Sequence, residues 1–72
     1  MPEASHELHV RMAQYFGDPV DDRGPMDYLK GRGYKLTHKW EWERPLGLKP
    51  TEKDLEVIQF LIEEWDFGGL AR

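Results

Sequence analysis

The three histidines are the side chains best suited to metal binding in this sequence. His6 and His9 stand three positions apart, so they would share one face of a helix, and His38 could supply a third imidazole. The order His6-Glu7-Leu8-His9 differs from the zinc-protease motif, in which two residues separate the glutamate from the second histidine. We therefore expect solvated histidines and no metal site.

The residue types needed for covalent or acid–base catalysis form no recognisable pattern. Ser5 is the only serine, there is no cysteine, and neither a Ser/His/Asp set nor a specific carboxylate pair can be assembled. The segment Gly31-Arg32-Gly33 lacks the third glycine of a dinucleotide fingerprint and precedes the expected strand instead of following one. We expect a protein that is not an enzyme and needs no cofactor.

The central segment, residues 30–44, is the best candidate for binding a partner. It carries five basic and two acidic residues, whereas residues 1–29 carry six acids and two bases, and residues 51–66 six acids and one base. Tryptophans among basic residues can stack on RNA bases or anchor a protein interface. The candidate partner-binding residues of this segment are Lys30, Arg32, Lys35, Lys39, Trp40 and Arg44.

The amino-terminal segment, residues 1–24, supplies three further candidates. Leu8, Met12 and Tyr15 are spaced by four and three, which favours a helix over residues 5–16 with Ser5 as its cap. Alternation of apolar residues leaves an edge strand over residues 7–12 as the alternative. Residues 17–25 are rich in Gly, Pro and Asp and indicate a hinge loop, so residues 1–24 could dock loosely or order only on a partner.

Residues 25–72 are expected to form the compact core. A short helix begins at Pro25 and ends at Gly31 or Gly33, and the alternation from Tyr34 to Trp42 predicts a strand with one aromatic face. At least one of Trp40 and Trp42 therefore belongs to the core. The strand could pair with the amino-terminal segment, within a hairpin over residues 34–44, or with residues 46–48.

The carboxy-terminal helix is the clearest element. Thr51 is the expected N-cap, and Gly68-Gly69 is expected to end the helix, with Leu70 folding back over it. The apolar stripe expected to face the core is Leu55, Ile58, Leu61, Ile62 and Trp65. The predicted fold is a small single α+β domain with the order α-α-β-α, its last helix packed on a short antiparallel sheet.

Charge and composition restrict the class of protein. Hydrophobic residues make up 39% of the chain, enough for a core, and the lack of cysteine favours a cytosolic setting. No segment has the length or composition of a membrane span or signal peptide, so no membrane partner is expected. The net charge of −4 disfavours a general nucleic-acid binder, and we expect a monomer in the free state.

The run from Phe60 to Leu70, FLIEEWDFGGL, following the segment from Tyr34 to Trp42, resembles small accessory proteins of tailed bacteriophages. In size, lack of cysteine and mixed charge the whole chain is similar to RNA polymerase-binding transcription inhibitors and antitermination factors, of the kind found in a lytic Xanthomonas phage. The resemblance implies a protein of the host cytoplasm that binds host RNA polymerase near the amino terminus of the β′ subunit, close to elongation factors and nascent RNA. It implies inhibition of promoter-dependent initiation and promotion of antitermination.

Two other functions remain open at this point. The acidic helix face formed by Glu52, Glu56, Glu63 and Glu64 could mimic nucleic-acid phosphates in an anti-defence, anti-CRISPR-like inhibitor, or could be a solvated surface. Residues 30–44 could bind RNA directly. These two alternatives and the transcription regulator each assign the contact with the partner to a different surface of the protein.

Overall fold

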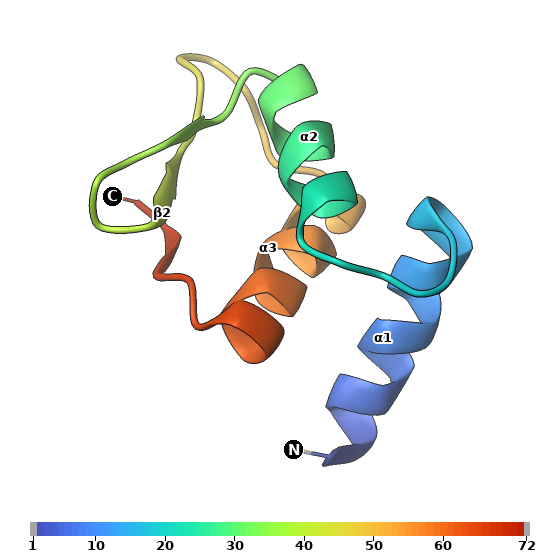
Figure 1. Ribbon diagram of the computed structural model, residues 1–72. Coiled ribbons are helices and arrows are strands. Elements are labelled where there is room, and N and C mark those ends of the chain that lie inside the picture. The colour runs from blue at the N-terminus through green and yellow to red at the C-terminus, as the bar shows by residue number, and fades with distance from the viewer. Residues whose placement is uncertain (1, 72) are drawn as a thin grey trace.

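The computed structural model describes residues 2–71. Its elements are α1 (Pro2–Phe16), α2 (Arg23–Gly31), β1 (Lys35–Leu36), β2 (Glu41–Glu43), α3 (Glu52–Trp65) and β3 (Gly69–Leu70). In Figure 1, α3 lies between α1 on one side and the small sheet on the other, and α2 covers its amino-terminal half. The predicted small α+β domain is confirmed.

The core is built around the buried face of α3. Side chains from all three helices and from the hairpin meet there, and partly buried residues such as Leu36, Leu48 and Ile62 close its edges. The buried hydrophobic residues are Leu8, Met12, Leu29, Tyr34, Trp42, Val57, Ile58, Phe60, Leu61 and Phe67. Burying large side chains of this kind stabilises a fold by about 1.5–3 kcal/mol each.

The amino-terminal segment is a helix, as the four-residue spacing of its apolar residues predicted, and the edge-strand alternative is wrong. The helix begins at Pro2, so Ser5 lies inside its first turns and is not the N-cap. Leu8 and Met12 lie one turn apart and are both buried against the core. The proposed division into a loosely docked segment 1–24 and a core 25–72 stays a prediction.

The expected single strand from Tyr34 to Trp42 is divided by a turn. Thr37 causes the reversal: its Oγ1 accepts hydrogen bonds from the backbone N–H groups of Lys39 and Glu41, each at 3.2 Å. Its own N–H donates to the Glu41 carbonyl at 2.8 Å. β1 and β2 consequently pair antiparallel, with Leu36 opposite Trp42, which confirms the hairpin among the three pairing alternatives.

The third strand, β3, was not predicted from the sequence. It follows α3 and pairs with β2 in the parallel direction, placing β2 at the centre of the sheet. The Gly68 N–H donates to the Trp40 carbonyl and the Ala71 N–H to the Trp42 carbonyl, both at 2.8 Å. The sheet is therefore mixed, not wholly antiparallel, because the chain returns along β2 after crossing over through α3.

The two ends of α3 follow the sequence to different degrees. Thr51 is the N-cap as predicted, and it forms a capping box with Asp54, in which each side chain accepts a hydrogen bond from the other residue's backbone. The carboxy-terminal end differs from the prediction. The helix ends at Trp65, the left-handed residue is Asp66 instead of a glycine, and Phe67, not Leu70, is the apolar residue buried beyond it.

The buried face of α3 is rotated relative to the predicted stripe. Asp54, Val57, Ile58 and Leu61 repeat at spacings of three and four and lie inside, together with Phe60. Leu55 is 49% exposed, and Trp65 lies at the edge of the core. The prediction for these two residues is wrong because the buried face begins with the carboxylate of Asp54, and a search for hydrophobic spacing does not count a carboxylate as buried.

Candidate functional site

An aromatic and acidic hollow of about 400 Å³ lies where the hairpin turn meets the end of α3. Its walls come from three parts of the chain: the N-cap of α2, the turn between β1 and β2, and the residues that end α3. The residues that line it, here called the aromatic hollow, are Asp22, Trp40, Trp65, Asp66 and Phe67. Because separate elements build it, its shape depends on the whole fold.

Trp40 is held at this hollow by its backbone. Its N–H donates to the Thr37 carbonyl at 3.0 Å, and its carbonyl accepts from Gly68. Its ring meets Phe67 edge-on, with ring centroids 5.3 Å apart. Trp40 is nevertheless 56% exposed, so the hairpin presents a large apolar surface to solvent.

Gly68 makes this arrangement possible. A Cβ at this position would lie 2.7 Å from the Glu41 Cγ and 3.1 Å from the Lys39 carbonyl oxygen. Only glycine lets the segment after α3 approach the hairpin turn this closely.

Backbone strain is concentrated at the same place. Within residues 2–71, the non-glycine residues with positive φ are Trp40, at 62°, and Asp66, at 61°, and both line the aromatic hollow. A left-handed conformation costs a non-glycine residue roughly 1–2 kcal/mol, and such strain gathers at functional sites. The folded state is therefore less stable than it would be without these two strained residues, whose backbone conformation positions their side chains in the hollow.

The two carboxylates of the hollow are free of internal partners. Throughout the described part of the chain, neither Asp22 nor Asp66 has a side-chain hydrogen bond or ion pair. Asp22 comes from the acidic segment 1–29 and Asp66 from the acidic segment 51–66. The fold thus places one unneutralised carboxylate from each acidic segment beside two exposed indole rings.

The predicted basic candidates do not form one surface. Lys35 and Arg44 come together at the open end of the hairpin, where they help to line a separate hollow of about 410 Å³ beside Leu46. Lys30 is exposed on α2, and Lys39 is exposed in the hairpin turn next to Trp40. Trp42 is completely buried, so of the two tryptophans only Trp40 is available to a partner.

Arg32 has a structural partner that the sequence did not reveal. Its guanidinium donates from Nε to Oδ1 of Asp54 at 3.1 Å and from NH2 to Oδ2 at 2.9 Å. The hydroxyls of Tyr28 and Tyr34 donate to the same carboxylate at 2.7 and 3.0 Å. This Asp54 network, formed by Asp54, Arg32, Tyr28, Tyr34 and Thr51, connects α2, the residue before β1 and α3, and it occupies Arg32.

Protonation in the Asp54 network follows from these contacts. Burial alone would raise the pKa of Asp54, but the hydrogen bonds from Arg32, Tyr28, Thr51 and Tyr34 outweigh it and hold that pKa well below its usual range. Burial, together with the hydrogen bond to Asp54, raises the pKa of Tyr34 to about 12. The network therefore holds a carboxylate and neutral tyrosines at neutral pH.

The candidates on α1 lie partly inside the fold. Leu8 and Met12 are core residues and are not accessible to a partner. Tyr15 is exposed, and its hydroxyl donates to Glu56 at 3.1 Å. The Lys53 ammonium lies 4.5 Å from the centre of the Tyr15 ring and 4.7 Å from that of Tyr28, which links the three helices through cation–π contacts.

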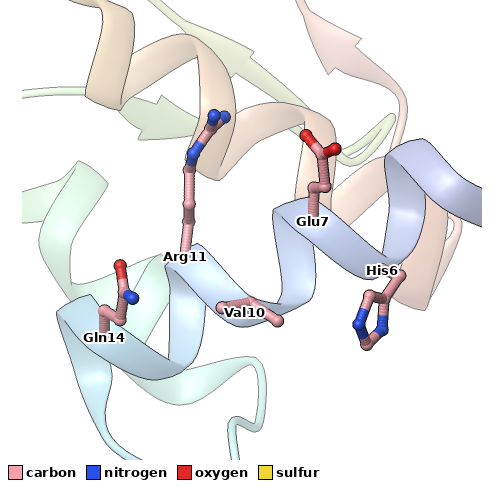
Figure 2. A pocket seen from close by; sticks show the side chains of 5 residues that line it. All are labelled: His6, Glu7, Val10, Arg11 and Gln14. Carbon is pink, nitrogen blue, oxygen red and sulfur yellow. The ribbon is translucent and has the colours of Figure 1, made fainter.

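A hollow of about 320 Å³ also runs along α1, lined by His6, Glu7, Val10, Arg11 and Gln14. Figure 2 shows that all five side chains come from this one helix, with Arg11 and Glu7 directed toward α3 and His6 directed the opposite way. The Arg11 guanidinium contacts Glu56 at 3.0 Å. A surface lined by one helix lacks a second wall, so it makes a weaker candidate than the aromatic hollow.

The acidic face of α3 is largely engaged within the fold. Glu56 pairs with Arg11, Glu64 lies 3.5 Å from the Nδ1 of His9, and Glu63 accepts a hydrogen bond from Gln59. In residues 2–71, no group of three His, Asp or Glu side chains is placed to hold a metal ion. No helix in the same range is long and apolar enough to cross a membrane.

Sequence reasoning identified Trp40 but missed the rest of the aromatic hollow. Trp65 was assigned to the core, and Asp22, Asp66 and Phe67 were given no role in binding. One sequence signal could have indicated a binding surface here: the run Trp65-Asp66-Phe67 at the end of a helix has an aromatic residue on each side of an aspartate. Nothing in the sequence indicated that the hairpin turn would lie against it.

The protein is thus a small α+β domain with an exposed hollow on its surface that is formed by residues from separate elements. The model of the family described as phage Pam3 gp59 related protein matches residues 1–72, and the chain belongs to this family. The resemblance to small bacteriophage proteins is thereby confirmed, while the family description says nothing about RNA polymerase. No curated protein and no solved structure matches the chain.

Proposed function

We propose that this phage-related protein is a regulator that acts by binding a host protein, and that host RNA polymerase is the partner. The single observation that carries a binding role is the exposed Trp40, fixed in a strained backbone conformation beside Trp65, which is 37% exposed. Tryptophan is among the residues that most often contribute dominant binding energy in interfaces. A solvent-exposed indole that costs folding energy to position is best explained by a partner.

The choice of RNA polymerase rests on the resemblance to small phage transcription regulators. A protein of this size can redirect a large enzyme by occupying one mobile junction, because it needs to bind only one of two states more tightly. We propose that binding near the amino terminus of the β′ subunit inhibits promoter-dependent initiation and promotes antitermination in the host cytoplasm. No cofactor or catalytic step is required.

The test is retention on purified bacterial RNA polymerase. We expect the immobilised chain to capture the enzyme at micromolar concentration or tighter, and to lower transcript yield from a promoter and increase read-through of a terminator. The matched variants are Trp40→Ser, which should weaken capture, and Leu55→Ser, an exposed residue of α3 outside the aromatic hollow, which should not. Absence of retention at low salt would remove this function.

A further inference from the structure

We propose that the aromatic hollow binds an arginine side chain presented by the partner protein. The inference rests on the proposed function, since it names the chemistry by which a protein partner is held. Two exposed indoles and two carboxylates line one concave surface, formed by Trp40, Trp65, Asp22 and Asp66. This combination matches the two binding modes of a guanidinium group.

The first mode is stacking on the aromatic rings. A cation within about 6 Å of a ring centre is attracted by the negative face of the ring, and tryptophan is the strongest aromatic partner. The Trp40 ring is supported edge-on by Phe67, and the Trp65 ring by Phe60 at 5.5 Å. Supported rings remain in place without a ligand, so little side-chain entropy is lost when one binds.

The second mode is pairing with a carboxylate. Asp22 and Asp66 have no internal cation in the described chain, in contrast to Asp54, Glu56 and Glu64, each of which faces a basic side chain. The planar guanidinium can donate two parallel hydrogen bonds to one carboxylate while its face lies on an aromatic ring. The same molecule already contains one such two-bond pair, in which Arg32 donates to both carboxylate oxygens of Asp54.

Long-range charge favours the same occupant. The chain has a net charge of −4, and its two most acidic segments each contribute one carboxylate to the aromatic hollow. Such a field attracts a basic protein segment and repels the phosphates of a nucleic acid. We therefore assign the hollow to a protein side chain and not to RNA.

The assay uses the full chain, labelled with ¹⁵N, and a short capped glycine peptide with one central arginine. We expect saturable shifts of the Trp40 and Trp65 indole N–H resonances, with a dissociation constant of about a millimolar, as befits one side chain. The buried Trp42 indole is an internal reference and should not move. The same peptide with citrulline, which keeps the shape and loses the charge, should leave all three resonances unchanged.

The matched variant is the double substitution Asp22→Asn and Asp66→Asn. Asparagine is accepted both at an N-cap and in the left-handed conformation, so the fold should be retained, as a thermal melt can verify. Binding of the arginine peptide should weaken by about tenfold or more, which corresponds to about 1.4 kcal/mol. A matched substitution of the exposed Asp27 to Asn should have no effect on binding.

Three results would overturn the inference: no shift of either exposed indole, equal shifts by the citrulline peptide, or shifts by single-stranded oligouridylate in place of the arginine peptide. The assay contains no polymerase, so its outcome is separate from that of the capture experiment. Peptide binding without capture would refute the polymerase as partner and keep the arginine site. Capture of the polymerase without binding of the peptide would refute the arginine site and keep the polymerase as partner.

Discussion

Arg32, the residue that caps the end of α2, holds both carboxylate oxygens of Asp54, the third residue of α3, through hydrogen bonds of 3.1 and 2.9 Å. The Asp54 side chain is completely buried, whereas that of Arg32 is one-third exposed. A buried carboxylate without its cation is strongly unfavourable, so this pair determines how α2 and α3 dock.

Replacing Arg32 by Gln should therefore destabilise the fold. We expect the free energy of unfolding to fall by about 2 kcal/mol, because hydrogen bonds to a charged group are lost while those from Tyr28 and Tyr34 remain. Urea denaturation followed by circular dichroism measures this change. Lys30→Gln, an exposed residue of the same helix, is the control and should change stability by less than about 0.5 kcal/mol. Equal effects of the two substitutions would contradict the role of the pair.

The Asp54 network also predicts how stability depends on pH. The pKa of Asp54 is lowered in the folded state, so the unfolded chain takes up a proton first as the pH falls below about 4, the ordinary carboxyl pKa. The stabilisation is fully present above that pH and is progressively lost below it. Urea midpoints measured from pH 7 to pH 2 should fall more steeply for the parent than for Asp54→Asn. Parallel curves would contradict the prediction.

At alkaline pH, stability is expected to fall as the pH rises, which is the opposite of its dependence at acid pH. The pKa of Tyr34 is raised to about 12, so the stabilisation is complete below the ordinary tyrosine pKa of about 10 and is lost between these two values. Tyr34→Phe should remove this part of the alkaline loss in the same urea measurements. If the variant lost stability between pH 10 and 12 as steeply as the parent, Tyr34 would not be its source.

The rotated face of α3 can be tested with two leucines. Leu61 is completely buried and Leu55 is 49% exposed, although the sequence placed both in the core. Leu61→Asp should unfold the domain, because a buried charge without a partner costs several kcal/mol. Leu55→Asp should leave the helical circular dichroism spectrum and the melting temperature nearly unchanged. Similar melting of the two variants would show that the buried face of α3 is wrong.

Lys53 should contribute to the docking of α1. Its ammonium lies near the Tyr15, Phe16 and Tyr28 rings, at 4.5, 5.8 and 4.7 Å from their centres. Lys53→Met keeps an unbranched side chain, one atom shorter, and removes the charge, and we expect a loss of about 1 kcal/mol. Amide hydrogen exchange should become faster in α1. Lys49→Met, at an exposed position before the helix, provides the comparison and should leave exchange in α1 as it is.

Strain at Trp40 predicts an unusual order of stability between two variants. Glycine accepts a φ of 62° without penalty, whereas alanine keeps the strain, and both substitutions lose the ring contact with Phe67. Trp40→Gly should be more stable than Trp40→Ala by about 1 kcal/mol. Thermal denaturation of both variants measures the difference. Greater stability of the alanine variant would argue against a strained turn.

The elements of this fold were predictable where local chemistry decides them. The capping box at Thr51, the apolar spacing in α1 and the alternation around Trp42 each carry their signal within a few residues. The prediction failed where distant residues decide. Asp54 could not be placed in the core without knowing that Arg32 and two tyrosines would converge on it, and β3 is too short to be noticed before β2 is positioned.

The candidate site was predictable only at Trp40, for the same reason. Its other residues come from the loop before α2 and from the end of α3, and the end of α3 is brought to Trp40 by the parallel pairing of β2 with β3. Charge counts along the sequence did identify the two acidic segments, but they could not show that one carboxylate from each segment would lie in the same hollow as Trp40.

The crossover from β2 through α3 to β3 has a kinetic consequence. The hairpin closes over a short stretch of chain, whereas β3 pairs with β2 across the whole length of α3, so we expect the β2–β3 pairing to form after the hairpin. Because Asp66 and Phe67 lie between α3 and β3, we expect the hollow beside Trp40 to be completed at that step. If the proposed function holds, a partly folded chain would then offer no complete hollow to a partner.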